Sequence, residues 1–219
     1  MSSEGFAFEV DGVRTSGAVY KASEAKAVLV LAHGAGAPQT HPWIVSVAEA
    51  IRARGVDVVT FNFLYMEGKR RTPDRNDVLE KTWLAAIEAV RARSDVAHGR
   101  LFIGGKSMGG RIASQVAASG AAVAGVVLLG YPLHPPGNPG RLRSRHLPEV
   151  PVPMLFVQGS RDPFGSPAEL EPIVATLGKG TRLYVVEGGD HSLSPLKSSG
   201  QTLEGVIGRV ADEVVQFIG

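Results

Sequence analysis

The chain has 219 residues, 44% hydrophobic and 20% charged, which is ordinary for a globular protein able to bury a sizeable core. It contains no cysteine, which excludes disulfides, thiolate metal sites and cysteine nucleophiles. The formal net charge is only +2, which gives no general argument for a nucleic-acid partner. No apolar run approaches the roughly 20 residues that span a bilayer, and the N-terminus lacks a basic region followed by an apolar run. We therefore expect a cytoplasmic protein without a membrane partner.

The N-terminal part of the chain is dominated by β-type segments. Residues 6–10 and 13–20 flank Asp11-Gly12, and an Asp-Gly pair between two such runs predicts a hairpin. Residues 27–32 form a continuous apolar run, which is typical of a strand buried on both faces. The run ends at the glycine-rich residues 33–37, which predict a loop.

Helices and strands then alternate to the C-terminus. Hydrophobic spacing near 3.6 residues predicts helices over about 42–54, from near Pro73 to Val90, over 110–118 and over about 203–217. A capping box at 166–169 predicts the start of another helix. Apolar runs predict strands at 56–63, 101–103, 122–129, 154–158 and 183–186. The alternation favours one α/β domain over residues 1–219, with a mostly parallel central sheet and helices on both faces.

The segment Gly105-Lys106-Ser107-Met108-Gly109 lies between a predicted strand and a predicted helix. This is the G-x-S-x-G pattern of a nucleophile elbow. Glycine is favoured two residues to either side of the serine because neighbouring backbones nearly touch in so sharp a turn. The pattern predicts Ser107 as a nucleophile. The alternative is a glycine-rich turn without a chemical role.

A serine hydroxyl needs a base to accept its proton, normally a histidine that a carboxylate orients. His191 and Asp162 each lie just past a predicted strand, where ligands bind in sheets of this kind. We therefore expect a catalytic triad of Ser107, His191 and Asp162. The alternatives are that Asp162 only caps a turn before Pro163, that Asp190 supplies the carboxylate, or that His191 is a solvated loop residue.

Attack of a serine on an ester places negative charge on the carbonyl oxygen, and fixed N–H donors stabilise it by roughly 3–4 kcal/mol each. We expect one donor from Met108, directly after the predicted nucleophile. The second is expected from Ala35 in the glycine-rich loop, with Gly34 as the alternative. His33 is expected to shape this loop by hydrogen bonding and not to act as a base.

By these motifs the chain resembles the α/β-hydrolase superfamily over nearly its whole length, and Ser, Asp, His is the order that fold implies. More narrowly, it resembles small cap-less bacterial hydrolases akin to dienelactone hydrolase. Its strongest resemblance is to a group of predicted hydrolases related to a vertebrate testis-expressed protein, in which residues 61–67 and 106–110 recur as motifs. Dienelactone hydrolase uses cysteine, which argues against that activity here. The short, proline-rich segment between Gly130 and Met154 predicts no large lid.

The residues just past strand ends are candidates for the lining of the substrate site: Gly34, Tyr65, Met66, Tyr131 and Phe164. For Tyr65 and Met66, packing on the core is an equal alternative. Two basic clusters, at 69–71 and 141–146, are either solvated loop charge or attract an anionic ester.

We therefore predict a serine hydrolase that cleaves small to medium acyl esters through an acyl-enzyme intermediate. Its partner is a small-molecule acyl substrate, and the predicted triad needs no metal or cofactor. A phosphate-binding loop is not expected, because no matching glycine motif occurs. Two alternatives stay open: a thioesterase or peptidase with the same triad, and a non-catalytic binding or scaffold protein of the same fold.

Overall fold

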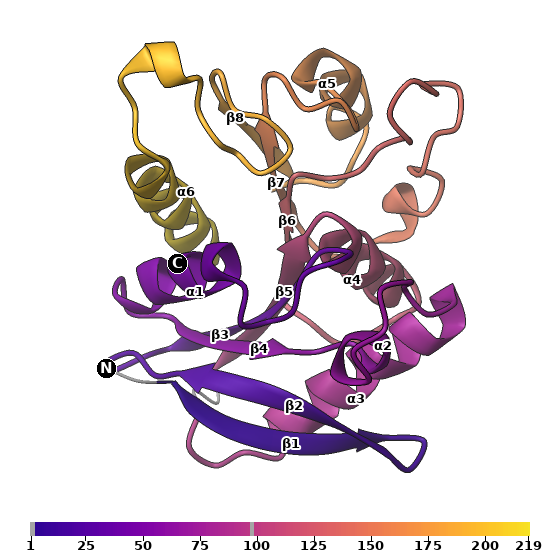
Figure 1. The fold of residues 1–219 in the computed structure, drawn as a ribbon, viewed down its shortest axis with the longest axis vertical. Helices are drawn as coiled ribbons and strands as arrows, with labels where there is room; N and C mark the ends of the chain where they lie inside the picture. The colour runs from indigo at the N-terminus through magenta and orange to yellow at the C-terminus, as the bar shows by residue number, and fades with distance from the viewer. Residues whose placement is uncertain (1–2, 97–98) are drawn as a thin grey trace.

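A computed structural model gives the structure of the protein and describes residues 3–96 and 99–219. At its centre lies an eight-stranded sheet in the order β1-β2-β4-β3-β5-β6-β7-β8 (Figure 1). The strands are β1 (Glu4–Val10), β2 (Val13–Tyr20), β3 (Ala27–Ala32), β4 (Asp57–Phe61), β5 (Arg100–Lys106), β6 (Gly125–Leu129), β7 (Met154–Gly159) and β8 (Arg182–Val186). β2 pairs antiparallel with β1 and β4, and all other neighbours are parallel. The predicted mostly parallel sheet is confirmed.

Helices cover both faces of this sheet (Figure 1). They are α1 (Pro42–Arg52), α2 (Leu64–Glu67), α3 (Asn76–Arg91), α4 (Met108–Ala118), α5 (Pro167–Val174) and α6 (Leu203–Ile218), with 3-10 turns η1 (Leu147–Glu149) and η2 (Lys197–Ser199). α1 and α6 contribute to the core on one face, and α3, α4 and α5 contribute to the core on the other. Residues 130–153 between β6 and β7 contain only the short η1, so this segment forms no large lid.

Successive side chains of β3 point to opposite faces of the sheet, and each face has its own hydrophobic core. Val28 and Val30 point into the core that α3 and α4 cover, whereas Leu29 and Leu31 point into the core that α1 and α6 cover. All four side chains are at most 2% exposed. A continuous apolar run is therefore the pattern that a strand covered on both faces requires.

The N-terminal hairpin forms as predicted. β1 and β2 pair in register up to Val10 opposite Val13, and the two residues between them close the turn. Asp11 has φ 49 and Gly12 has φ 79. A type I′ turn requires positive φ at both central residues, and aspartate and glycine tolerate it better than most residues.

Several predicted boundaries are corrected by tertiary contacts. The helix expected from near Pro73 begins at Asn76, because the Asp74 carboxylate accepts a hydrogen bond from Tyr65 N at 2.9 Å and pairs with Arg70 at 2.6 Å. The strand expected over 56–63 ends at Phe61, since the chain turns into α2, which the sequence did not predict.

The proline-rich segment 134–153 is partly buried. The side chains of His134, Leu147 and Val150 lie against the core, and Leu147 is 0% exposed. His134 Nε2 also lies 3.1 Å from Glu169 Oε1 in the predicted capping box that starts α5. This segment is therefore anchored at several points along its length.

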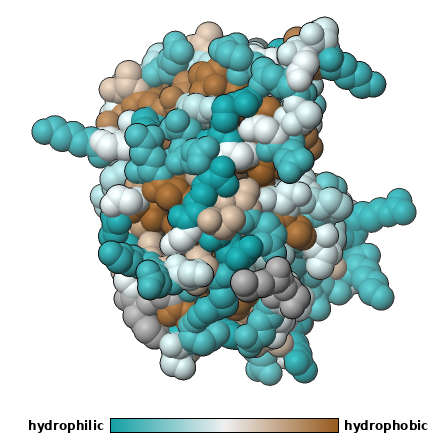
Figure 2. Space-filling model, turned by 90° about the vertical axis from the view of Figure 1, so that its left-hand side faces the viewer, coloured by the Kyte–Doolittle hydropathy of each residue, from teal (hydrophilic) through white to brown (hydrophobic). Residues whose placement is uncertain are grey.

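Hydrophilic residues cover most of the face shown in Figure 2, and hydrophobic residues appear there in small, separate areas. The large apolar side chains that remain exposed are scattered in the sequence: Val13, Leu84, Leu142, Leu196 and Leu203. In the described part of the chain, no helix combines the length and the apolar character needed to cross a membrane.

Candidate active site

Ser107 occupies a sharp turn between the last residue of β5 and the first residue of α4. Its backbone has φ 50 and ψ −115, a conformation that costs of order 1–3 kcal/mol for a residue other than glycine. A Cβ added at Gly105 would lie 2.6 Å from Ala32 O, and one at Gly109 would lie 2.5 Å from His33 O. Only glycine fits at these two positions, which explains the spacing of the motif.

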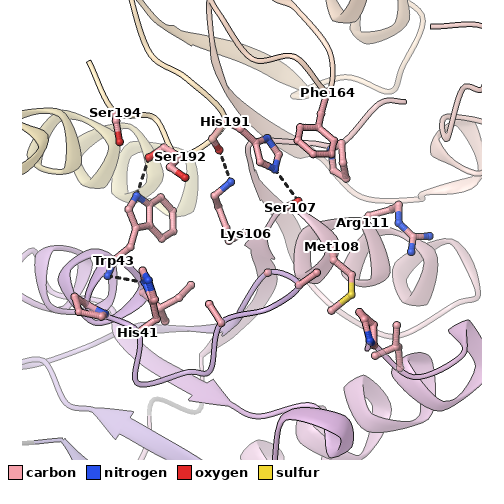
Figure 3. A pocket seen from close by; sticks show the side chains of 18 of the residues that line it. His41, Trp43, Lys106, Ser107, Met108, Arg111, Phe164, His191, Ser192 and Ser194 are labelled. Carbon is pink, nitrogen blue, oxygen red and sulfur yellow. Dashed lines mark hydrogen bonds between the residues drawn. The ribbon is translucent and has the colours of Figure 1, made fainter. Parts of the chain in front are cut away.

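The structure brings Ser107, His191 and Asp162 together at the carboxyl edge of the sheet. His191 Nε2 lies 2.8 Å from Ser107 Oγ (Figure 3). On its other side, His191 Nδ1 lies 2.8 Å from Asp162 Oδ2. Since an ionised carboxylate only accepts hydrogen bonds, Nδ1 carries the proton and Nε2 is free to accept the serine hydroxyl proton. The three side chains come from the ends of β5, β8 and β7, as the sequence predicted.

Asp162 is held by more than the histidine. Its side chain is 0% exposed, its Oδ2 accepts a hydrogen bond from Gln158 Nε2 at 2.9 Å, and its Oδ1 accepts one from Phe164 N at 2.8 Å. Gln158 is itself buried and accepts a hydrogen bond from Tyr131 N through its Oε1. The bond to Phe164 N is the turn cap that the sequence analysis gave as an alternative. Asp162 therefore both caps this turn and contacts His191.

Asp190, the other candidate carboxylate, faces its own loop. Its Oδ1 accepts hydrogen bonds from Ser192 N at 2.7 Å and Ser194 N at 3.0 Å. It therefore closes the turn that carries His191 and leaves the imidazole to Asp162. The Phe164 ring stacks on the His191 ring with centroids 4.1 Å apart, which covers one face of the imidazole.

The loop after β3 is shaped by His33, as expected. This side chain is fully buried, and its Nε2 accepts a hydrogen bond from Phe63 N at 3.1 Å. Nδ1 must then carry the proton, which it donates to Gly34 O at 2.7 Å. Burial lowers the pKa of His33 to about 4, against a weaker opposing effect of the Gly34 hydrogen bond. His33 is therefore neutral near pH 7 and uses both ring nitrogens to fix the loop.

Two backbone N–H groups beside Ser107 are available as donors. Met108 is the first residue of α4, and the amide of a first helical residue has no partner within its helix. Among the described residues, no hydrogen bond uses the amide of Ala35. Ala35 and Met108 both line the cavity at Ser107, and a Cβ added at the adjoining Gly34 would lie 3.6 Å from Ser107 Cβ.

Ser107 opens into a cavity of about 900 Å³. In Figure 3, Ser107 lies between Trp43 on one side and Arg111 on the other. The apolar part of the wall comes from several elements: Ala35, Ala37, Pro42, Trp43, Ile44, Pro73, Leu79, Met108, Pro132, Phe164, Leu203 and Ile207. Trp43 is fixed there because its Nε1 donates to Ser192 O at 2.8 Å.

The predicted lining residues divide into two groups. Gly34 and Phe164 line the cavity. Tyr65, Met66 and Tyr131 do not, which corrects that part of the prediction. Tyr65 and Tyr131 are at most 1% exposed and Met66 packs against the same core, so these side chains turn inward although their positions follow strand ends.

Lys106 is a site residue that sequence reasoning did not single out. It is 9% exposed, its Nζ donates to the backbone oxygen of His191, and it lies 5.8 Å from the centroid of the Trp43 ring. Burial lowers the pKa of Lys106 to about 8, and the nearby charges of Asp162 and Asp190 oppose that shift. The only sequence signal was its place beside Ser107 in the elbow.

Chemically, the arrangement is a hydroxyl bonded to an imidazole, which is bonded in turn to a buried carboxylate. Such a chain can move the serine proton to the imidazole when the oxygen attacks an electrophilic carbon. Within residues 3–96 and 99–219, no group of three or more His, Asp or Glu side chains is arranged to hold a metal ion.

Comparison with known proteins identifies the family of the chain. The model of the alpha/beta hydrolase domain family matches residues 25–219. Similar solved structures include a dienelactone hydrolase from Anabaena variabilis, with 21% identity, 99% of this chain and 96% of that chain covered, and a TM-score of 0.78. An alpha-beta serine hydrolase homologue from Coxiella burnetii has 17% identity, coverage of 100% and 99%, and a TM-score of 0.77.

A serine hydrolase without a lid from Xanthomonas campestris has 20% identity, coverage of 98% and 95%, and a TM-score of 0.74. At these sequence identities, similarity to solved structures supports the fold and no more. The family model covers most of the sequence, including Ser107, Asp162 and His191. The chain therefore belongs to the α/β-hydrolase domain family.

Proposed function

We propose that the protein is a serine hydrolase that cleaves small to medium acyl esters through an acyl-enzyme intermediate. The observation that carries this proposal is the unbroken hydrogen-bond chain from Asp162 through His191 to Ser107, which ends at a cavity. A volume of about 900 Å³ with an apolar wall suits a short or medium acyl chain.

In the first half of the reaction, Ser107 Oγ attacks the ester carbonyl carbon while His191 Nε2 takes the hydroxyl proton. Asp162 stabilises the imidazolium that forms. The carbonyl oxygen becomes an oxyanion, which accepts hydrogen bonds from the N–H groups of Met108 and Ala35. The bond between the carbonyl carbon and the alcohol oxygen then breaks, and the alcohol leaves with the proton from His191.

In the second half, water attacks the acyl group on Ser107 and gives a proton to His191 Nε2. A second tetrahedral oxyanion forms at the same N–H groups and collapses. The bond between Oγ and the acyl carbon breaks, Oγ recovers the proton from His191, and the carboxylic acid leaves. Each cycle therefore consumes one ester and one water and restores the free enzyme.

The test is replacement of the nucleophile. Ser107→Ala removes the attacking oxygen, and we expect turnover of p-nitrophenyl acetate to fall by at least about 10³-fold. Circular dichroism and thermal unfolding of the variant check that the fold is intact. Turnover close to that of the wild type in a folded variant would contradict the mechanism.

A fluorophosphonate probe separates the enzyme from a non-catalytic scaffold. We expect mass spectrometry to find the covalent adduct on Ser107 of the wild type and no adduct in Ser107→Ala. An unlabelled Ser107 in folded wild-type protein would favour the scaffold. An ester, a thioester and an amide of the same acyl group then show which type of bond is cleaved fastest. We expect the highest rate for the ester.

A further inference from the structure

We propose that Arg111 and Arg143 form an anion subsite in the cavity at Ser107, so that the preferred esters carry a carboxylate or phosphate group. The inference rests on the proposed esterase function and deepens it by naming a class of substrate. Both side chains line the same cavity as Ser107 and His191. Arg111 comes from α4, and Arg143 comes from the proline-rich segment between β6 and β7.

Neither guanidinium is neutralised by the protein. In the described part of the chain, no carboxylate lies within 4.0 Å of Arg111 or Arg143. Among the described residues, the Arg111 guanidinium donates to the neutral amide oxygens of Asn76 at 3.3 Å and Gln115 at 3.1 Å. The Arg143 guanidinium makes one long contact there, of 3.5 Å from its Nη1 to Pro132 O.

The acidic groups of this region are engaged elsewhere. Asp74 lines the cavity, but it pairs with Arg70 at 2.6 Å and accepts a hydrogen bond from Tyr65 N. Glu80 accepts a hydrogen bond from Asn76 Nδ2 at 2.5 Å and reaches Arg111 only through its longer-range charge. The excess positive charge therefore faces the cavity.

The two cations also act on each other. Burial lowers the pKa of Arg111, and the charge of Arg143 acts in the same direction, while Tyr131 and Glu80 oppose it. Like charges in a partly desolvated cavity repel more strongly than in water. A bound anion would relieve this repulsion and would accept hydrogen bonds from both planar guanidinium groups, which suits carboxylate and phosphate.

Arg143 is presented to the cavity by a fixed backbone. Its N–H donates to Leu133 O at 2.8 Å, and its carbonyl accepts a hydrogen bond from the Tyr131 hydroxyl at 2.7 Å. The neighbouring Arg141 and Arg145 are exposed and do not line the cavity. Within the basic cluster 141–146, Arg143 is therefore the arginine that lines the cavity, and Arg141 and Arg145 are in solvent.

Arg111 follows the nucleophile by one helical turn. Its N–H donates to Ser107 O at 3.0 Å, the hydrogen bond between residues four apart in an α-helix. The proposed subsite therefore lies beside the start of α4, in the cavity that Ser107 also lines. Figure 3 shows Arg111 on the side of Ser107 away from Trp43.

The test compares esters that differ in charge but not in length. Monoethyl succinate carries a carboxylate where ethyl levulinate carries a neutral methyl ketone, and chromatography measures both products. We expect kcat/KM to be at least about tenfold higher for succinate, because hydrogen bonds to charged groups are the stronger class. A second pair, 2-acetoxyethyl phosphate and 2-acetoxyethanol, asks whether the anion is instead a phosphate in the alcohol part.

Arg143→Gln should reduce the preference for the anionic ester about tenfold, and Arg141→Gln on the same segment should leave it unchanged. The preference of the wild type should also fall as salt rises. Equal preference in the wild type and Arg143→Gln, or no preference in either pair, would overturn the proposal. If no ester is cleaved at all, the esterase function fails, but calorimetry of succinate binding to the wild type and Arg143→Gln still tests the subsite. Equal binding, or none, overturns it.

Discussion

Two loops at the carboxyl edge of the sheet each present a histidine: His33 after β3 and His191 after β8. The His33 ring is 0% exposed, and both of its nitrogens are bonded to backbone groups. The His191 side chain is 20% exposed and lies between a carboxylate and a serine hydroxyl. His33 therefore holds the backbone of its loop in place, whereas His191 is the candidate base.

The difference lies in what the second nitrogen meets. In His33, Nε2 faces the N–H of Phe63, so a proton added there would meet another proton, and burial already lowers the pKa to about 4. In His191, Nε2 faces the Ser107 hydroxyl, and Asp162 stabilises the proton on the opposite nitrogen. A histidine can act as a base only where its acceptor nitrogen points at the group that must lose the proton.

The strongest test of this comparison replaces each histidine in turn. His191→Ala should lower kcat for p-nitrophenyl acetate by at least about 10³-fold, because no other group can take the serine proton. His33→Asn should lower it by no more than about 10²-fold, which is the order of losing one oxyanion donor through a displaced loop. Steady-state kinetics at pH 7.5 on folded protein measure both. Equal losses would end the distinction between the two loops.

The carboxylate behind His191 gives the next largest effect. In Asp162→Asn, the amide cannot hold the proton on Nδ1 as a carboxylate does, and kcat should fall by about 10²–10⁴-fold. Asp190→Asn is the matched control, because the Asp190 side chain, among the described residues, accepts hydrogen bonds from the backbone of its own turn and none from His191. We expect that control to keep kcat within tenfold of the wild type. A larger loss in Asp190→Asn than in Asp162→Asn would reverse the assignment of the two carboxylates.

The parts of the site that the sequence predicted share one property. Ser107, Asp162 and His191 each stand in a glycine- or proline-containing loop directly after an apolar run, and parallel strands carry all such loops to one edge. The position of a residue along the chain was enough to place them. The strand order itself, with β4 between β2 and β3, came only from the structure.

What sequence reasoning missed depends on side-chain direction and tertiary contact. Tyr131 follows a strand end as Phe164 does, but it turns into the core and hydrogen-bonds the Arg143 backbone. Gln158 reads as one more strand residue, yet it is buried and donates to Asp162. Neither fact has a signature in spacing or composition, because tertiary contacts set the direction of a loop side chain and the partner of a buried amide.

The environment of His33 also predicts how stability depends on pH. Its pKa is about 4 in the folded protein, whereas an exposed histidine has a pKa of 6.5. Between these values the unfolded chain binds a proton that the folded protein does not, so acidification lowers the free energy of unfolding. The full effect is up to about 3 kcal/mol, at roughly 1.4 kcal/mol per pKa unit.

In His33→Asn this contribution is absent. We expect the variant to be less stable than the wild type at pH 7. The difference between their free energies of unfolding should decrease as pH falls from 6.5 to 4. Urea unfolding at several pH values measures both curves. If this difference stays constant over this range, His33 is not the buried neutral group that the comparison requires.

Lys106 gives the smallest expected effect and asks what holds the His191 loop in place. The His33 loop is fixed by its own ring, whereas the His191 loop receives a hydrogen bond from Lys106 Nζ to the His191 carbonyl. Lys106→Met keeps the apolar stem along Trp43 and removes the donor. We expect kcat to fall about tenfold, the order of losing one hydrogen bond to a charged group, while KM for a neutral ester changes little.

That separation of kcat from KM distinguishes positioning of the base from general damage to the cavity, which would raise KM as well. Lys81→Met is the control, because the ammonium of Lys81 is exposed and pairs with Asp11 far from the site in sequence. If Lys106→Met keeps the kcat of the wild type, the Asp190 turn holds the His191 loop without the lysine. In that case each histidine loop is held by hydrogen bonds of its own residues. The two loops then differ only in the group that faces the Nε2 atom of the histidine.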